Sequence, residues 1–156
     1  RCDCIVNLNV LRFTRDTTIC KYLRKCWEKI DRLASYTYEY APYFFYYFYS
    51  KAWREGLSCG FDVREKVIEE LKNDTLSGFP LILTFTSASI LGIRGDDMDR
   101  AYQKIKAALL EDGGPREEVY FYILGARGPT KYRFFGRTFP AIVLLEGVLN
   151  YAEIDK

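Results

Sequence analysis

Apolar and polar positions alternate at the start of the chain. Cys4, Val6, Leu8 and Val10 are separated by residues that include the polar Asn7. A period of two residues is typical of a strand with one buried face, because successive side chains of a strand point to opposite sides. We therefore predict a half-buried strand over residues 3–13.

The period then becomes helical. Asp16 can cap a helix whose apolar side chains recur every three or four residues. Its predicted inner stripe consists of Ile19, Leu23, Cys26, Ile30 and Leu33. Further along, residues 62–65 have the spacing of a capping box, with Asp in place of the usual Ser or Thr. They predict a helix whose inward side chains are Val67, Ile68 and Leu71.

Between these two helices lies a segment dominated by rings. Of the 18 residues from Tyr36 to Trp53, 11 are aromatic. Pro42 fits the first turn of a helix and Gly56 fits the position just beyond its end, so we predict a helix over residues 42–55. Only Lys51 and Arg54 supply positive charge, so the segment lacks the cationic track that stacking on nucleic acid needs. We interpret it as core or as a seam between two copies of the chain.

In the second half, residues 80–86 form a short, continuous apolar run that favours a central strand. Gly95 and Asp96 open a predicted helix that Gly113 closes. Its inward side chains are Met98, Ala101, Tyr102, Ile105 and Leu109. Residues 119–124 and 131–135 read as two strands of a hairpin around a turn at 125–129. The helical spacing of Glu146, Asn150 and Glu153 favours a final helix.

These elements predict an α+β (mixed) fold. We expect a small sheet of about four strands packed with four to five helices, the helices concentrated in the N-terminal half. A length of 156 residues favours a single domain, 1–156.

Composition narrows the class of protein. A hydrophobic content of 49% with 28% charged residues is typical of a folded globule. The net charge of +2 does not mark the whole molecule as a nucleic-acid binder, so any basic signal must be local. We find neither a stretch apolar enough to span a bilayer nor a signal-like segment, and therefore expect a cytoplasmic protein with no membrane partner.

The chain contains no histidine, which excludes Ser-His-Asp and Cys-His catalysis and His-ligated zinc. It also contains one Gln and one Met beside abundant Glu, Lys, Arg and Tyr. Depletion of heat-labile residues predicts a thermophilic source. In composition the chain resembles small proteins of hyperthermophilic archaea and their viruses. The resemblance implies an intracellular or virion setting and a role on nucleic acid or in assembly, and it assigns no residue a role.

All five cysteines precede residue 60, and no C-x-x-C pair occurs. Cys2 and Cys4 are too far apart along a strand for a relaxed disulfide. Cys20 and Cys26 lie on different sides of one helix and cannot share a metal. Two interpretations stay open: buried free thiols, or a disulfide that ties the first strand to a later helix. Inside cells the second is expected mainly in hyperthermophiles.

The strongest local signal for function is the predicted hairpin. Four cations without any acid are interleaved there with rings, namely Arg127, Lys131, Arg133 and Arg137, with Tyr132 and Phe135 among the rings. Such cations can contact the phosphates of DNA or RNA while a ring stacks on a base. Arg94 and Arg100 would add to the site if they lie near it. The alternative is an ordinary amphipathic strand whose charges protect a sheet edge.

Acidic residues suggest a second chemistry. Asp97 and Asp99 follow a predicted strand and open a helix, where they could hold Mg²⁺ for phosphodiester hydrolysis, with Glu118 as a further catalytic carboxylate. The alternative is that the aspartates complement the helix dipole and Glu118 lies in a turn.

We therefore predict a nucleic-acid-binding protein, with a metal-dependent nuclease as a refinement. The main alternative is a non-enzymatic module that forms a homodimer or larger homo-oligomer through the predicted helix around Tyr43–Tyr49, since interfaces favour Tyr, Trp and Arg. A weaker alternative is a small-molecule binding module with an aromatic-lined pocket.

Overall fold

The computed structural model describes residues 3–33, 40–114, 118–124 and 131–153, with the backbone alone for 118–124 and 131–135. Its chain divides into two compact units. Unit 1 comprises residues 1–61 and 119–135, and unit 2 comprises residues 62–118 and 136–156. The expectation of a single domain stays a prediction.

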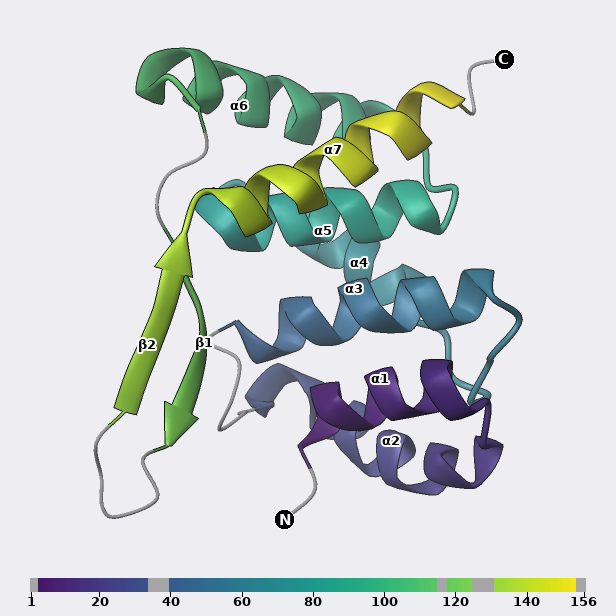
Figure 1. Ribbon diagram of the computed structural model, residues 1–156. Coiled ribbons are helices and arrows are strands. Elements are labelled where there is room, and N and C mark those ends of the chain that lie inside the picture. Colours follow the sequence, from purple (N-terminus) through teal and green to yellow (C-terminus); the bar gives the residue numbers. More distant parts are fainter. Residues whose placement is uncertain (1–2, 34–39, 115–117, 125–130, 154–156) are drawn as a thin grey trace. The chain divides into compact units, whose positions relative to one another are not determined.

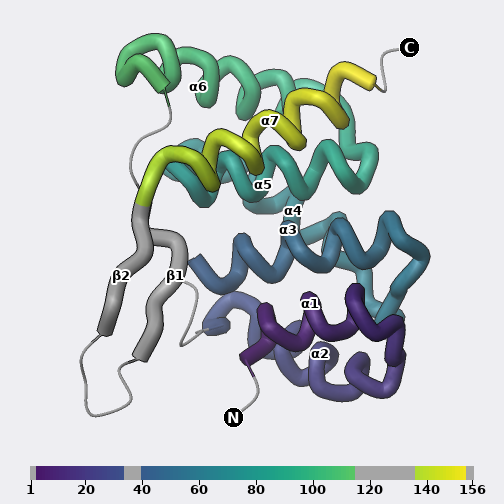
Figure 2. Tube along the Cα trace, viewed as in Figure 1, coloured from purple at the N-terminus to yellow at the C-terminus, as the bar shows by residue number. Residues whose placement is uncertain are grey.

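Unit 1 consists of helices and most of one hairpin (Figure 1). Its helical elements are α1 (Cys4–Thr14), η1 (Thr17–Ile19), α2 (Cys20–Trp27), η2 (Ile30–Arg32) and α3 (Ala41–Arg54). The strands β1 (Glu118–Leu124) and β2 (Lys131–Gly136) pair with each other as a two-stranded sheet. The trace in Figure 2 shows α1 running beside both α2 and α3, in agreement with the contacts between these helices.

The core of unit 1 is aromatic. Phe44, Phe45 and Tyr49 of α3 are fully buried. The Phe61 ring stacks on Tyr49 at 4.4 Å and on Trp27 at 5.2 Å between centroids. The predicted helix over residues 42–55 and its interpretation as core are therefore confirmed. Rings at nearly every position of one helix are tolerated because neighbouring elements cover several of its sides.

Unit 2 contains α4 (Arg64–Leu71), α5 (Gly78–Ile90), α6 (Asp96–Asp112) and α7 (Thr138–Glu153). Helix α5 is the centre, because every residue from Leu81 to Ile90 is buried. Helix α7 packs along α5 (Figure 1), and their backbones approach closely at Gly147. A Cβ at this glycine would lie 2.4 Å from Thr86 Oγ1, while that hydroxyl donates a hydrogen bond of 3.0 Å to the Val143 carbonyl.

The predicted α+β fold class is wrong. The described residues form an all-α fold with one β-hairpin, not a sheet of about four strands packed with helices. Two of the four predicted strands, 3–13 and 80–86, are helical. The helices are also not concentrated in the N-terminal half, since α6 and α7 occupy much of the second half.

Residues 3–13 are helical because the segment carries a helical period as well as the alternating one. Ile5, Leu8 and Leu11 are buried on one side of α1, whereas Val6 and Val10 are largely exposed. The Asp3 carboxylate caps the helix by accepting from the Ile5 backbone N–H at 2.9 Å. The cap and the burial of the helical stripe outweigh the alternating pattern.

Residues 80–86 are helical because α5 is buried on all sides. A continuously apolar run has no period, so its pattern cannot separate a buried strand from a buried helix. The hydroxyl groups within it are satisfied locally: Thr84 Oγ1 donates to the Pro80 carbonyl at 2.9 Å, and Ser87 Oγ donates to the Leu83 carbonyl at 2.7 Å. These bonds let β-branched and hydroxylated residues lie inside a helix without an unpaired polar group.

Both hairpin strands, the helix after residue 62, the helix after Gly95 and the C-terminal helix are confirmed. The helix predicted to follow Asp16 is shorter than its apolar stripe indicated, because Asp16 caps the 3-10 turn η1, α2 ends at Trp27, and Ile30 lies in the 3-10 turn η2. The predicted turn at 125–129 lies outside the described residues. Among the described residues, none of the helices has the combined length and apolar character that a bilayer crossing requires.

Candidate nucleic-acid interface

Helix α2 separates an apolar inner side from a charged outer side. Leu23 and Cys26 are buried, whereas the outer residues of the helix are exposed. We define the basic face of α2 as Lys21, Tyr22, Lys25 and Lys29, the last of which lies just after the helix ends. Residues four apart lie on the same side of a helix, about 6 Å apart along its axis. The face therefore presents a row of cations, which the exposed Glu28 interrupts between Lys25 and Lys29.

One aromatic ring belongs to this row. Tyr22 is 46% exposed, and Lys21 Nζ lies 4.9 Å from the centroid of its ring. An exposed ring beside cations is the combination that binds single-stranded nucleic acid, because phosphates meet the charges while a base stacks on the ring.

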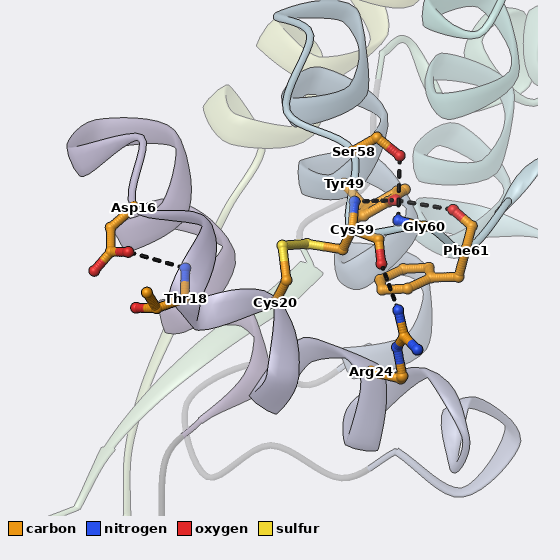
Figure 3. Close-up of a disulfide and its surroundings, with 9 residues drawn as sticks. All are labelled: Asp16, Thr18, Cys20, Arg24, Tyr49, Ser58, Cys59, Gly60 and Phe61. Carbon is orange, nitrogen blue, oxygen red and sulfur yellow. Dashed lines mark hydrogen bonds between the residues drawn. A yellow bond between two sulfur atoms is a disulfide. The ribbon is translucent and has the colours of Figure 1, made fainter.

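Two disulfides fix α2 in place. Cys4–Cys26 joins it to α1, and Cys20–Cys59 joins its first residue to the segment that follows α3. Figure 3 shows the second bond and its surroundings, where Arg24 Nη2 donates to the Cys59 carbonyl at 3.3 Å. The helix is thus held near both ends, which orders the backbone that carries the basic face.

The free-thiol interpretation is therefore wrong for these four cysteines. The other interpretation, a disulfide from the first predicted element to a later helix, is confirmed by Cys4–Cys26, although the first element is itself a helix. The fifth residue, Cys2, lies outside the described residues.

The fully buried Tyr49 supports the same region (Figure 3). Its hydroxyl donates to the Phe61 carbonyl at 2.9 Å and accepts from the Cys59 backbone N–H at 3.2 Å. A buried hydroxyl with both a donor and an acceptor partner is fully satisfied, so it orders the chain around the second disulfide.

Charge is divided unevenly between the units. Unit 1 carries 13 Lys and Arg against 6 Asp and Glu, a net charge of +7, whereas unit 2 carries 10 against 15, a net charge of −5. The overall charge of +2 conceals this difference. A net positive charge confined to one of two units is the local signal that a near-neutral total cannot show.

The carboxylate next to the basic face stays ionised. Asp16 accepts from the Thr18 backbone N–H at 2.9 Å, and hydrogen bonds from the Thr18 side chain and backbone hold the pKa of Asp16 below its usual range.

Beyond the other end of α2, a hollow of about 500 Å³ is lined, among the described residues, by Glu28, Lys29, Asp31 and Arg32. Its described lining is charged, unlike the aromatic pocket expected of a small-molecule module.

The structure describes only some of the cations of the predicted hairpin. Lys131, Tyr132 and Arg133 belong to β2, and the structure describes the backbone of these three residues. Arg127 lies outside the described residues. Arg137 is exposed in the bend before α7 and belongs to unit 2. Their roles in nucleic-acid binding stay predictions.

Asp97 and Asp99 have partners within unit 2. The Asp97 carboxylate forms an ion pair with Arg100, and the Asp99 carboxylate accepts a hydrogen bond from the Tyr151 hydroxyl. Glu118 is the first residue of β1, of which the structure describes the backbone. In the part of the chain that the structure describes, no group of three His, Cys, Asp or Glu side chains is arranged to hold a metal ion.

Two arginines that could have extended the basic site are engaged elsewhere. Arg94 places its guanidinium over the Tyr151 ring at 5.0 Å, and its two terminal nitrogens are buried. Arg100 pairs with Asp97 and lies 3.9 Å from Asp74. The terminal nitrogens of Arg94 are thus withdrawn from the surface, and Arg100, although 52% exposed, has two carboxylates within 4 Å.

The basic face of α2 was missed by sequence reasoning, although one signal could have found it. Once the inner stripe of Leu23 and Cys26 is assigned, the helical period places Lys21 and Lys25 on the opposite side. Comparison of the chain with protein-family models, with curated proteins and with solved structures finds no match. The proposals below therefore rest on the geometry of the chain itself.

Proposed function

We propose that the protein binds nucleic acid through unit 1, with the basic face of α2 as the main contact surface. The observation that carries the proposal is a row of exposed cations and an exposed ring on a helix that two disulfides hold, in a unit of net charge +7. Lys131 and Arg133 of the hairpin belong to the same unit and add to its positive charge.

The physical basis of binding is charge neutralisation. Each lysine that meets a phosphate releases condensed counterions, so affinity falls steeply with added salt. The cross-links hold α2 before the ligand arrives, so little backbone conformational freedom is lost on binding. Because Tyr22 offers a ring and the face carries no built array of base-specific donors, single-stranded DNA or RNA bound without sequence preference is the favoured ligand.

The proposal is tested by fluorescence anisotropy with labelled single-stranded DNA, single-stranded RNA and duplex DNA. Wild-type protein should bind at low salt, and Lys21→Gln with Lys25→Gln should weaken binding. The slope of log affinity against log salt should shrink by about 0.7 to 0.9 for each lost phosphate contact. Tyr22→Ala should weaken single-strand binding and leave duplex binding nearly unchanged.

The matched control removes the same charge from unit 2. Lys72 and Lys106 are exposed, so Lys72→Gln with Lys106→Gln lowers the net charge by the same amount. This variant should bind like the wild type. Absence of binding at low salt would overturn the proposal, as would equal weakening by both double variants. The double variant Lys131→Ala with Arg133→Ala measures how much the hairpin contributes to the binding affinity.

A nuclease activity is a separate refinement of the proposal. It would require Asp97, Asp99 and Glu118 to bind Mg²⁺, whereas Asp97 and Asp99 bond to Arg100 and Tyr151 in this structure. The test is incubation of a bound DNA or RNA with Mg²⁺ or Mn²⁺. Cleavage that Asp97→Ala abolishes would establish it, and unchanged substrate with either metal would end it.

We propose that the protein works in the cytoplasm of a thermophilic organism, or in a virion that is assembled there. Structural disulfides are rare in the cytosol of mesophiles but are common inside hyperthermophiles, so the two disulfides and the composition fit such a source together. Thermal unfolding of the oxidised protein tests the source. A melting temperature in the mesophilic range, about 45–65 °C, would contradict it.

A further inference from the structure

The two disulfides of unit 1 differ in the surroundings of their sulfurs. Each joins a partly exposed cysteine to a buried one: Cys20 to Cys59, which is 5% exposed, and Cys4 to Cys26, which is 8% exposed. A reducing thiolate attacks the sulfur that it can reach, and the other sulfur leaves as a thiolate. Reduction therefore begins at Cys20 or Cys4, and its rate depends on how well a thiolate is stabilised at Cys59 or Cys26.

The surroundings of Cys59 favour a thiolate. Arg24 places its guanidinium beside this residue, where Nη2 donates to the Cys59 carbonyl at 3.3 Å (Figure 3). A cation next to a cysteine stabilises its thiolate. The acid that follows in sequence, Asp62, is exposed and accepts from the Arg64 backbone N–H at 2.8 Å. Cys59 is therefore a good leaving group.

The surroundings of Cys26 disfavour a thiolate. Its Sγ lies 3.3 Å from the Tyr22 carbonyl oxygen, whose partial negative charge repels an anionic sulfur. Cys26 also stands in the last turn of α2, at the negative end of the helix dipole. Its charged neighbours Lys25 and Glu28 are exposed and opposite in sign, so they offset one another. Cys26 is therefore a poorer leaving group than Cys59.

Charges beside the attacked sulfurs act in the same direction. Asp3, directly before Cys4, keeps its carboxylate at the start of α1, where it repels an anionic reductant. Beside Cys20 stand Asp16 and Lys21, which are exposed, opposite in charge and close enough to interact. An incoming thiolate is therefore repelled less at Cys20 than at Cys4.

We propose that Cys20–Cys59 is a redox-sensitive bond, which a dithiol reduces before Cys4–Cys26. One thiolate of the dithiol attacks Cys20 Sγ, the S–S bond breaks, and Cys59 leaves as a thiolate. The second sulfur of the dithiol then attacks the mixed disulfide and releases Cys20. The dithiol gives up two electrons and two protons and becomes a cyclic disulfide, and both cysteines end as thiols.

Reduction loosens the basic face of α2, a consequence that rests on the proposed function for its effect on binding. Helix α2 has eight residues, of which Leu23 and Cys26 are buried, and η1 before it buries none. A helix this short is marginal without tertiary support. Loss of Cys20–Cys59 frees the start of the helix, where the basic face begins, while the other disulfide still holds its end. The reduced form should therefore bind nucleic acid more weakly.

Timed alkylation tests the order of reduction. The protein carries Cys2→Ser, which removes the fifth thiol, and reacts with limiting dithiothreitol before trapping with N-ethylmaleimide and peptide mass spectrometry. Cys20 and Cys59 should be labelled several-fold faster than Cys4 and Cys26. Equal rates, or earlier labelling of Cys4 and Cys26, would overturn the proposal.

Variants of Arg24 test the electrostatic cause. Arg24→Gln should slow the reduction of Cys20–Cys59 several-fold, whereas Arg24→Lys, which keeps the charge, should remain close to the wild type. Lys25→Gln is the matched control, because it removes the same charge at the next position, and it should change little. An unchanged rate in Arg24→Gln, or equal slowing in Lys25→Gln, would overturn the role of Arg24. Far-ultraviolet circular dichroism checks that each oxidised variant is folded.

Fluorescence anisotropy with single-stranded DNA tests the consequence for binding. Cys20→Ser with Cys59→Ser imitates the reduced form and should bind several-fold more weakly than the oxidised wild type. Equal affinity of the two proteins would overturn the redox control of binding. An oxidised wild type that does not bind at low salt would instead overturn the proposed function, and the alkylation experiment does not depend on that result.

Discussion

Unit 1 is packed around stacked rings and cross-linked by two disulfides, whereas unit 2, of the same length, contains no cysteine and is packed by close contact between helices. Each unit comprises 78 residues. Segments of this size gain little stability from one hydrophobic core, so an additional device is expected in each. Unit 1 uses covalent bonds, and unit 2 uses the fully buried α5 with Gly147 of α7 against it.

The difference also separates two kinds of surface. Because covalent bonds tie α2 to its neighbours, its outer side is free to carry the cations Lys21, Lys25 and Lys29 without loss of order. Unit 2 instead exposes the apolar side chains Ile142, Leu145 and Leu149 of α7 and has an acidic composition. Covalent cross-links therefore accompany a charged surface in unit 1, whereas close helix packing accompanies an apolar one in unit 2. Four predictions test this comparison.

The largest expected effect is loss of the disulfides. They close loops of 22 and 39 residues, for which the chain-entropy model gives stabilisation of about 3 and 4 kcal/mol. Cys20→Ser with Cys59→Ser should therefore destabilise unit 1 slightly more than Cys4→Ser with Cys26→Ser. Denaturant unfolding measures the loss. In these variants, backbone amides of unit 1 should exchange hydrogen faster than in the wild type, while unit 2 serves as the internal control. Equal acceleration in both units would contradict the comparison.

The corresponding change in unit 2 is Gly147→Ala. Its new methyl group would meet Thr86 Oγ1 at 2.4 Å and the Phe85 ring at 3.1 Å, so we expect a loss of about 1–3 kcal/mol from overpacking. Thermal unfolding measures it. The penalty should be smaller in a Thr86→Ala background, because the clashing hydroxyl is gone. Gln103→Ala, at an exposed position of α6, is the control and should change little.

An effect of similar size is expected from Tyr49→Phe. The change removes the hydroxyl that bonds to the Phe61 carbonyl and the Cys59 N–H, and it leaves two polar groups of the backbone without this partner. We expect a loss of about 1–3 kcal/mol, confined to unit 1. Denaturant unfolding measures it. Tyr22→Phe, an exposed ring of the same unit, is the matched control, and an equally large loss there would show that burial is not the cause.

The smallest effect concerns pH. A hydrogen bond from Arg12 holds the pKa of Glu55 below its usual range. A lowered folded-state pKa contributes stability above the unfolded value, about 4.3 for glutamate, and this stability is lost as pH falls through the folded-state pKa. Because the pair is exposed, we expect less than about 1 kcal/mol. In Glu55→Gln, the free energy of unfolding of unit 1 should fall less on acidification than it does in the wild type. An unchanged pH profile would contradict this.

The sequence predicted those elements whose ends are marked by residues that start or stop a helix. Pro42 and Gly56 bound α3, and Gly95 and Gly113 bound α6, because these residues act on the backbone where they stand. The hairpin strands also follow from local pattern. The rings of α3 were assigned to the core for a similar reason, since a helix with rings on most sides must be covered. Sequence reasoning named the hairpin, whose role stays a prediction, and overlooked the basic face of α2.

Tertiary structure alone decided what depends on partners distant in sequence. Residues 3–13 carry two periods and residues 80–86 carry none, so burial against other helices selected the helix in both. Pairing of Cys4 with Cys26 and of Cys20 with Cys59 required the folded positions of α1, α2 and α3. Asp99 gained its partner Tyr151 the same way. Local chemistry fixes where elements begin and end, while burial, which sums contacts from the whole chain, fixes which element forms and which side it exposes.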